Sequence, residues 1–461
     1  MKAFLTVPEA APRRLAAGAR LGLILLLLPL AVTAASAQQA TPPPPAPSPL
    51  TMEQAVAVAL ESNPEVRTMD AERRMAAAGA RMARSMTRPQ VSANGYAGTG
   101  TMENIVSTTP SVMPTNYGMV PPKPFAVGNL TLMVPLYTGG RLAGTVRAAG
   151  AREAAAGADA AETRAQVALM VREAYLGVLL AGEMVSVAQA RLDAATAMRE
   201  VARAQFDAGK GILASVQRAD AERADAERML LAARNDREKM LLELRAAMGV
   251  ALDAPLLPAG TLASAAAAEP SPPARALDDW LRQAREGRPA LRAREARTEE
   301  ARAIALSARG SRLPQVYGMA MGDAFSSREM GSGSGHTVAV ALSLPLVDGG
   351  QRRAEADEAR AGEERAASQR RAEELRVERE VRSAWLDSET AARSLAAAVA
   401  GLDAAQAAYD VIALRVQNQK SILVEQMEAL ATLTQARAGV ARARFDQALA
   451  AARLLRAAGR E

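Results

Sequence analysis

The sequence contains no cysteine and a single histidine, His336, among its 461 residues. Without cysteine the chain has no disulfides, no thiolate zinc sites, no cysteine nucleophiles and no lipid anchor on an N-terminal cysteine. His336 follows the glycine-rich segment 331–335, and we interpret it as a solvated loop residue. We therefore predict that the protein is not an enzyme and holds no metal and no cofactor.

Aromatic residues are scarce, at 3% of the chain, whereas 49% of residues are hydrophobic and alanine is abundant. This composition favours long helices whose backbones approach closely, and it excludes a disordered chain. The net charge is +6, and basic and acidic residues are interleaved along the chain. We therefore predict no nucleic-acid partner.

The only long apolar run of the N-terminal region is LGLILLLLPLAV (21–32), which follows a basic stretch and precedes the small residues ASA (35–37). Its length falls short of the ~20 residues that cross a bilayer. We therefore predict a cleaved signal peptide over 1–37, with a membrane anchor as the alternative reading. No later stretch is expected to form a spanning helix.

The sequence repeats itself. PLYTGG (135–140) is similar to PLVDGG (345–350), and VREAYL (171–176) is similar to VRSAWL (381–386), both at an offset of 210 residues. We predict an internal duplication. The expected organisation is a proline-rich linker at 38–50, a first repeat at 51–250, an inter-repeat linker at 251–274 and a second repeat at 275–461.

Each repeat is expected to contain a helix, two strands around a polar loop (about 103–126 and 326–335), and two long helices joined by a tip turn. In TVAVALSL (337–344), apolar residues alternate with small or polar ones, as in a barrel strand with one face in lipid, although a soluble half-buried strand has the same period. A proline-free helix over about 140–206 would be ~100 Å long.

The repeated motif predicts a turn from strand to helix. Proline ends a strand because it lacks an N–H donor, and paired glycines permit a sharp turn before the helix. The turn residues are Pro135, Gly139, Gly140, Pro345, Gly349 and Gly350.

The long helix carries a heptad pattern. Val171, Val178, Val185 and Leu192 recur at every seventh position and predict a coiled-coil seam. Tyr175 in the first repeat and Trp385 in the second are expected to anchor the packing between helices.

These motifs resemble those of the outer-membrane efflux proteins, the TolC-like outer-membrane factors. The resemblance rests on PLYTGGR (135–141) and PLVDGGQ (345–351), on LTMEQAVAVALESNPEV (50–66) and on FDAGKGILASVQRADAE (206–222). It implies a mainly α fold with a small β portion. Four strands from each subunit of a homotrimer would form a transmembrane β-barrel, continued by a coiled-coil α-helical barrel in the periplasm of a Gram-negative bacterium. A four-stranded sheet cannot leave its edges open in lipid, which independently requires several copies.

The resemblance also implies two functional regions at the helix tips. The adaptor-docking tips would comprise Ala208, Gly209, Lys210, Asn418 and Gln419, the last at a position where glycine is usual. Glu425 and Glu428 share one helix face and would close the aperture as a threefold ring of carboxylates, with Lys420 and Arg415 as ion-pair partners. The alternative reading is that both glutamates are ordinary surface residues.

The expected function is that of a passive exit duct for an efflux pump or a type I secretion system. The partners implied are a periplasmic adaptor, an inner-membrane transporter of the RND, ABC or MFS type, and outer-membrane lipid. A soluble periplasmic coiled-coil adaptor is the alternative, and it leaves the alternating strands unexplained. The sequence does not identify the cargo.

Overall fold

The computed structural model describes residues 49–100, 123–268, 276–327, 331–418 and 420–460. The predicted signal peptide, most of the proline-rich linker, much of the first polar loop and Gln419 lie outside the described residues. The described elements are mainly helical, with a small sheet, as predicted from the sequence.

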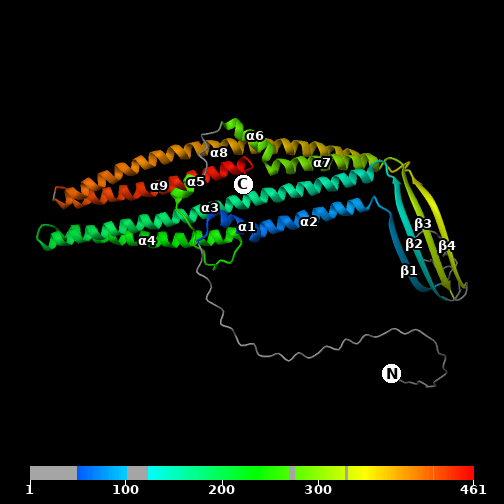
Figure 1. The fold of residues 1–461 in the computed structure, drawn as a ribbon, viewed down its shortest axis with the longest axis horizontal. Helices are drawn as coiled ribbons and strands as arrows, with labels where there is room; N and C mark the ends of the chain where they lie inside the picture. The colour runs from blue at the N-terminus through cyan, green and yellow to red at the C-terminus, as the bar shows by residue number, and fades with distance from the viewer. Residues whose placement is uncertain (1–48, 101–122, 269–275, 328–330, 419, 461) are drawn as a thin grey trace, which may run out of the picture. The chain divides into compact units, whose positions relative to one another are not determined.

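The two halves of the chain have the same order of elements (Figure 1). The first half contains α1 (Met52–Ser62), α2 (Pro64–Ser85), β1 (Gln90–Gly100), β2 (Lys123–Tyr137), α3 (Arg141–Asp207) and α4 (Leu213–Met248). The second contains α6 (Leu277–Gly287), α7 (Pro289–Gly310), β3 (Gln315–Ser327), β4 (Gly331–Ser343), α8 (Gln351–Gln417) and α9 (Leu423–Ala457). The short helix α5 (Leu262–Ala268) lies between them.

Each half opens with two helices where the sequence predicted one. The break falls at Asn63–Pro64 in the first half and at Arg288–Pro289 in the second. A residue before proline is pushed out of the helical region, and both Asn63 (ψ 129°) and Arg288 (ψ 119°) are extended. Proline then starts the next helix, where its missing N–H costs nothing.

The strands form one antiparallel sheet in the order β1-β2-β3-β4. The two hairpins have equivalent registers, because Gln90 lies opposite Met133 in the first and Gln315 lies opposite Ser343 in the second. Pro135 was predicted to end its strand, but it lies inside β2, at a register shift beyond the last residue paired with β1. A proline is tolerated there because its nitrogen lies beyond the paired part of β1 and need not donate a hydrogen bond to that strand.

The second polar loop is shorter than predicted, because residues 331–335 belong to β4. His336 is therefore an exposed strand residue and not a loop residue. Glycines disfavour strands, but Gly333 lies opposite Phe325, and a Cβ at Gly333 would come within 2.5 Å of that ring. The aromatic side chain covers the glycine and compensates for its lack of packing surface.

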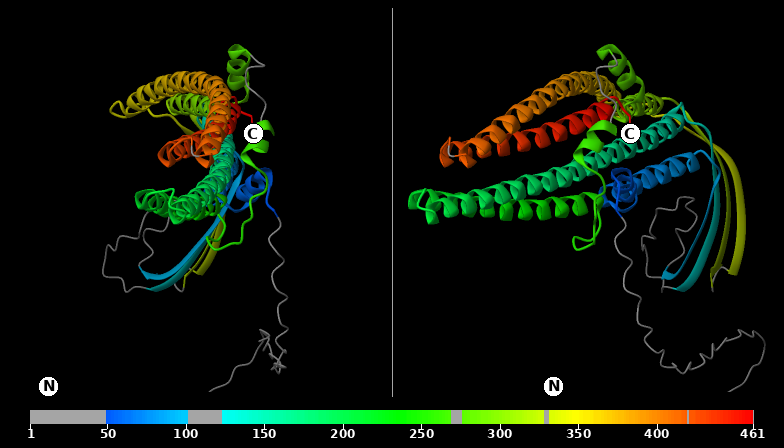
Figure 2. Two further views of the ribbon diagram at one scale, coloured as in Figure 1. Left: turned by 90° about the vertical axis from the view of Figure 1, so that its left-hand side faces the viewer. Right: turned by 60° about the vertical axis from the view of Figure 1, so that its left-hand side comes forward.

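The helices α2, α3, α7 and α8 lie side by side next to the sheet, and the α3–α4 and α8–α9 hairpins extend away from it (Figures 1 and 2). Helix α7 packs on both α3 and α8. The α3–α7 approach is close because a Cβ at Gly144 would lie 2.5 Å from the Ser307 nitrogen.

The buried row of α3 differs from the predicted seam. Val171 and Val178 are buried, but Val185 and Leu192 are only half-buried. Further along the helix the buried positions at every seventh residue are Ala181, Ala188, Ala195 and Ala202. Val187 and Met198 are also buried in this stretch, so the buried face of α3 combines a row of alanines with larger side chains.

Tyr175 is buried in the core beside α1 and α4. Its hydroxyl lies 2.8 Å from the carbonyl oxygen of Leu50 and 2.5 Å from that of Ala259, so it joins the N-terminal segment to the linker between the halves. Burial raises the pKa of this hydroxyl. Trp385 is half-buried and packs against the core formed by α6, α8 and α9.

By length and composition, α8 is apolar enough to cross a membrane, which the sequence analysis did not anticipate. An 18-residue window has a mean hydropathy of 1.3, and 6% of the window is buried. Alanine-rich stretches such as 395–401 account for this value. An exposed apolar surface of this kind also suits contact with another protein surface.

Candidate functional site

The two faces of the sheet differ in polarity. One face of β4 carries the exposed side chains of Val338, Val340 and Leu342, which are 82%, 68% and 68% exposed. The register adds Leu130 of β2 and Val91 of β1 to the same face, and both are more than half exposed. This face suits an apolar environment far better than water.

The opposite face is more polar. Asn94, Asn129 and Asp323 form one row across β1, β2 and β3, and the Asn94 amide donates to Asn129 Oδ1 at 3.1 Å. Tyr96 and Phe125 lie on the same face in an edge-to-face contact with ring centroids 6.0 Å apart. A sheet with one apolar and one mixed polar face can separate lipid from a watery interior.

The repeated glycines lie between strand and helix in both halves. Gly139 (φ 59°) and Gly140 (φ 89°) follow β2, and Gly140 caps α3. Gly349 (φ 63°) and Gly350 (φ 90°) precede α8 in the same conformation. These left-handed angles favour glycine. Pro345 lies between β4 and this second turn, outside the strand.

Arg141 ties the first turn of α3 to the sheet. Its Nη2 donates to Gln315 Oε1 at 3.2 Å and to the Tyr317 hydroxyl at 2.9 Å. The Tyr317 hydroxyl in turn donates to Gln315 Oε1. Because Gln315 and Tyr317 belong to β3, this network fixes a helix of the first half against a strand of the second.

The first helix tip is a tight, regular turn. Ala208 caps α3, Gly209 adopts φ 72°, the Lys210 N–H donates to the Gln205 carbonyl at 2.8 Å, and the Gly209 N–H donates to the Phe206 carbonyl at 2.9 Å. These two bonds and the left-handed glycine define a Schellman motif.

The second tip repeats part of this pattern. The Lys420 N–H donates to the Arg415 carbonyl at 2.7 Å, as Lys210 does to Gln205 in the first tip. The Asn418 side chain adds a bond to the Leu414 carbonyl at 2.8 Å.

The predicted aperture residues lie at the start of α9. Glu425 and Glu428 are exposed on the first turns, and the Ser421 hydroxyl donates to Glu425. Within the described ranges, neither glutamate forms an ion pair with Arg415 or Lys420, and the nearest pairs along the chain are Arg393–Glu389 and Arg442–Asp446.

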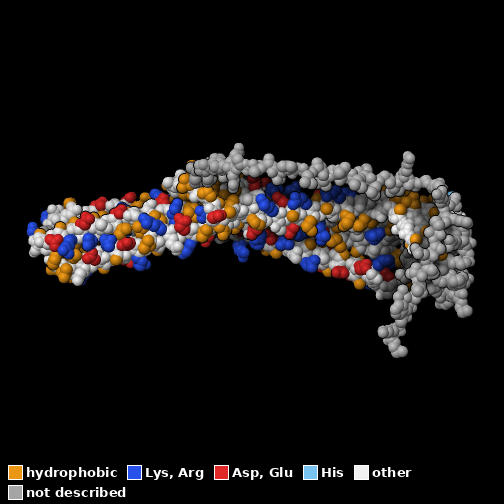
Figure 3. All heavy atoms as spheres, turned by 90° about the horizontal axis from the view of Figure 1, so that it is seen from below, with side chains coloured by type: hydrophobic (Ala, Val, Ile, Leu, Met, Phe, Trp, Pro, Cys, Tyr) orange, Lys and Arg blue, Asp and Glu red, His pale blue; other side chains and the backbone are white. Residues whose placement is uncertain are grey.

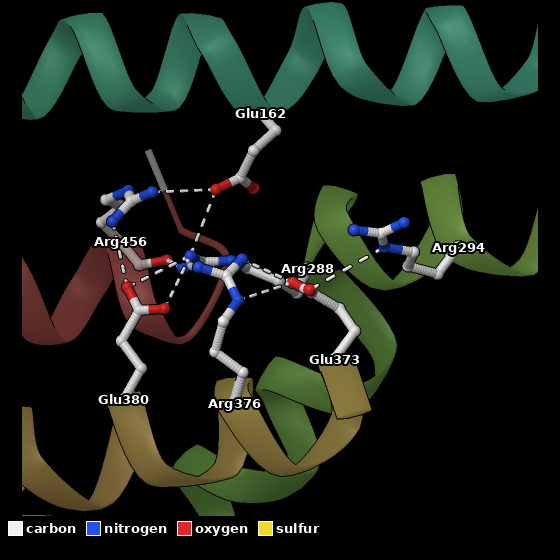
Figure 4. Close-up of polar contacts among 7 residues, drawn as sticks. All are labelled: Glu162, Arg288, Arg294, Glu373, Arg376, Glu380 and Arg456. Carbon is white, nitrogen blue, oxygen red and sulfur yellow. Dashed lines mark hydrogen bonds and ion pairs between the residues drawn. The ribbon is translucent and has the colours of Figure 1, made fainter. Parts of the chain in front are cut away.

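A buried ion cluster that the sequence analysis missed joins the two halves (Figure 4). Arg288, only 1% exposed, lies 3.1 Å from Glu380 of α8 and 3.2 Å from Glu162 of α3. Arg456 of α9 contacts the same two carboxylates at 3.0 Å and 2.9 Å. Two arginines thus share two glutamates, and charge is balanced where water is largely excluded.

On the face of the molecule that Figure 3 shows, basic and acidic side chains both occur along the whole described surface. The two signs are interspersed in that view, in agreement with the interleaved sequence. In the part of the chain that the structure describes, no group of three or more histidine, aspartate or glutamate side chains is arranged to hold a metal ion.

A sheet with one apolar face, continued by long helical hairpins, is the architecture of an outer-membrane channel subunit. The chain matches the model of the outer membrane efflux protein family over residues 55–250 and 280–460, and it therefore belongs to this family. Proteins of this family are efflux channels and not enzymes, which confirms both the resemblance and the predicted lack of enzymatic activity. The family match does not favour the soluble adaptor alternative.

The chain is also similar to one curated relative in sequence and to solved channel structures in fold. The outer membrane efflux protein BepC of Brucella suis is 27% identical over 291 residues, which span 62% of this chain and 62% of BepC. The channel CusC superposes with a TM-score of 0.77 at 16% identity, covering 89% of this chain and 92% of CusC. The outer membrane protein VceC of Vibrio cholerae superposes with a TM-score of 0.73 at 18% identity, covering 88% of this chain and 96% of VceC.

Proposed function

We propose that the chain is one subunit of a passive trimeric exit duct in the outer membrane of a Gram-negative bacterium. The observation that carries the proposal is the sheet, which has an apolar face exposed along β4 and two edge strands, β1 and β4, that have no outer neighbour within the described residues. Open strand edges are not tolerated in lipid. Further copies of the chain must therefore close the sheet into a barrel.

Three copies are favoured over two. Two copies would give an eight-stranded barrel, whose interior is filled by side chains, whereas a twelve-stranded barrel leaves a water-filled lumen. The face that carries Asn94, Asn129 and Asp323 would line this lumen, and the face that carries Val338 and Val340 would contact lipid.

The helices would continue the lumen through the periplasm as an α-helical barrel. The exposed alanine-rich surface of α8 supports this, because a helix in water does not otherwise leave such a surface uncovered. The duct would dock a periplasmic adaptor at the tips around Gly209 and Asn418, and through it an inner-membrane transporter. It would have no chemistry of its own, and its cargo would be set by the transporter.

We also propose that the two halves arose by duplication, with the boundaries given by the sequence. The equivalent registers of the two hairpins and the matches of one family model to residues 55–250 and 280–460 support this. A signal peptide over 1–37 would direct the chain to export.

Membrane extraction and conductance test the proposed function. The native protein should require detergent for extraction, should elute with the mass of three mature subunits, and should conduct ions in planar bilayers. A water-soluble monomer that forms no channel would overturn the proposal and revive the soluble adaptor.

A deletion tests adaptor docking separately. Removal of residues 208–211 should abolish efflux in cells, because the left-handed turn at Gly209 would be lost, while the trimer still assembles in the membrane. Gly209→Asn is the matched control, since asparagine tolerates a left-handed conformation, and it should retain efflux. Unchanged efflux in the deletion variant would contradict docking at this tip.

A further inference from the structure

In the described chain, the sheet and the layer of helices next to it each end in an uncovered element on two sides, and the uncovered strand and helix lie on the same side in each case. The strands run in the order β1-β2-β3-β4, and the helices next to them pack in the order α2-α3-α7-α8 (Figures 1 and 2). One side therefore presents β1 and α2, and the other presents β4 and α8. Between these sides lies an internal seam, where β2 and α3 of the first half meet β3 and α7 of the second.

The internal seam predicts the register of the seam between copies. Residues of β1 correspond to those of β3 at an offset of 225, and residues of β2 correspond to those of β4 at an offset of 210, which together convert the Gln90–Met133 pair into Gln315–Ser343. In the internal seam Asn129 lies opposite Asp323. The same offsets place Ala339 of one copy opposite Gly98 of the next.

The contacts between helices can be compared across the same seam. On α3, Arg152 pairs with Glu300 of α7 at 3.1 Å, whereas its neighbour Glu153 pairs with α2 on the other side, through Arg84. At the offset of 210, Arg152 in the first half corresponds to Gly362 in the second, and Glu153 corresponds to Glu363.

Glu363 pairs with Arg302 of α7 inside the chain, at 3.5 Å. Gly362 lies ~100° around α8 from Glu363. On α3 the equivalent step leads from Glu153, which contacts α2, to Arg152, which contacts the next helix of the layer. The residue that corresponds to Glu300 is Met75 of α2. An ion pair of the internal seam is thus replaced, between copies, by a methionine and a glycine.

The two side chains are complementary in size. Met75 is 72% exposed, and a Cβ added at Gly362 would meet nothing within 4 Å, so both positions are uncovered in the single chain. A long, flexible thioether fills the space over a glycine, and its burial removes an exposed apolar side chain from water. A second copy of this chain is the occupant that fits both the helix surface and the unpaired strand edge.

We infer that the seam between copies repeats the internal seam, with Gly98 opposite Ala339 of the next copy and Met75 lying over Gly362 of the next copy. This inference rests on the proposed oligomeric duct, and it adds the register and the side chains that join the subunits. The joint between copies is apolar at the position where the joint within the chain is an ion pair.

Cysteine cross-linking tests the register directly, because the protein contains no cysteine of its own. The double variant Gly98→Cys/Ala339→Cys is oxidised in membranes and separated by denaturing electrophoresis without reductant. We expect disulfide-linked dimers and trimers. The matched control is Asn129→Cys/Asp323→Cys, the equivalent pair of the internal seam, which should form a disulfide within one subunit and leave its mass unchanged.

Register-shifted pairs separate the inference from the proposed function. If Gly98→Cys cross-links with Thr337→Cys or Ala341→Cys but not with Ala339→Cys, the subunits associate and the inferred register is wrong. If no pair cross-links and the native mass is that of one subunit, both the inference and the duct fail.

A size exchange tests the helix contact. Gly362→Leu should reduce the trimer fraction in detergent at least several-fold, because the space for Met75 is filled. Adding Met75→Gly should restore the trimer. A trimer fraction that Gly362→Leu leaves unchanged would overturn the Met75–Gly362 contact.

Discussion

Arg288 donates a hydrogen bond to the main-chain carbonyl of Arg456, and the Asn63 amide donates a similar bond to the carbonyl of Ala247 in the first half. Both residues precede the proline that starts the second helix of their half, and both donate to a main-chain carbonyl in the last turn of the final long helix of that half. The asparagine does this as a neutral group. The arginine side chain is charged and buried, and its charge is compensated by ion pairs with Glu380 and Glu162.

Replacement of Arg288 with asparagine should therefore destabilise the protein. The carbonyl bond can be kept, but two partly buried carboxylates are left with Arg456 alone. Removing one member of a buried ion pair typically costs about 3 kcal/mol or more. We expect a clear decrease in the midpoint of thermal unfolding, measured by far-ultraviolet circular dichroism in detergent.

A second substitution provides the control. Met170 occupies the position in the first half that corresponds to Glu380, so Arg288→Asn/Glu380→Met rebuilds the neutral arrangement of the first half. The double variant should be more stable than the sum of the two single changes predicts. Additive losses would show that the Arg288–Glu380 contact contributes little.

The close approach of α3 and α7 predicts opposite effects for two glycine substitutions on one helix. Gly144→Ala would place a Cβ 2.5 Å from the Ser307 nitrogen and 2.8 Å from the Ala303 carbonyl, both backbone atoms that cannot yield easily. We expect a loss of about 1–3 kcal/mol, the usual cost of overpacking, seen as a lower unfolding midpoint.

Gly150→Ala is the matched control, because a Cβ at that position meets nothing within 4 Å. Alanine is the better helix former by roughly 0.5–1 kcal/mol, so this variant should be as stable as the parent or more stable. Equal effects of the two substitutions would contradict the close packing of the internal seam.

Local sequence patterns predicted the elements whose structure depends on neighbouring residues. The absence of proline over about 140–206 anticipated α3, and the paired glycines at 139–140 anticipated the turn before it. The repetition of the motif anticipated the second set of elements. In each of these cases helix propensity, proline and backbone angles act within a few residues of the pattern.

The features that the sequence did not predict depend on residues far apart along the chain. Gly333 is in a strand because Phe325 covers it, and the face of α3 that is buried, along Ala188 instead of Val185, depends on the helices that pack against it. Arg288 and Arg456 are 168 positions apart. The one available signal was the arginine at a position where the first half has Asn63, directly before a proline.

The first hairpin should lose stability in acid. The hydrogen bond from Arg228 is the main influence that lowers the pKa of Asp225, and Arg191 lowers it further. A carboxyl whose pKa is lower in the folded state stabilises the fold above its unfolded pKa of about 4, and this contribution disappears as the pH falls through the folded pKa.

Asp225→Asn should therefore lower stability near neutral pH by less than ~1 kcal/mol, because the side chain is partly exposed. The difference between the variant and the parent should vanish well below pH 4. Unfolding midpoints measured across this range test the prediction, and a difference that persists at low pH would show that the Arg191 and Arg228 contacts do not act through charge.

The carboxylates at the start of α9 give the most direct prediction for conduction. Glu425 and Glu428 are both exposed and carry no ion pair with Arg415 or Lys420 within the described residues, so their charges are available to ions. In a trimer they would form a ring of carboxylates that attracts cations. Glu425→Ala/Glu428→Ala should weaken block by divalent cations roughly tenfold, which corresponds to ~1.4 kcal/mol, or raise conductance in planar bilayers.

Glu243 provides the control, because it is an exposed glutamate near the C-terminal end of α4, at the end of that helix away from the tip. Glu243→Ala should change neither the block nor the conductance. If the double variant conducts like the parent and is blocked equally well, these glutamates are surface residues and the aperture lies elsewhere.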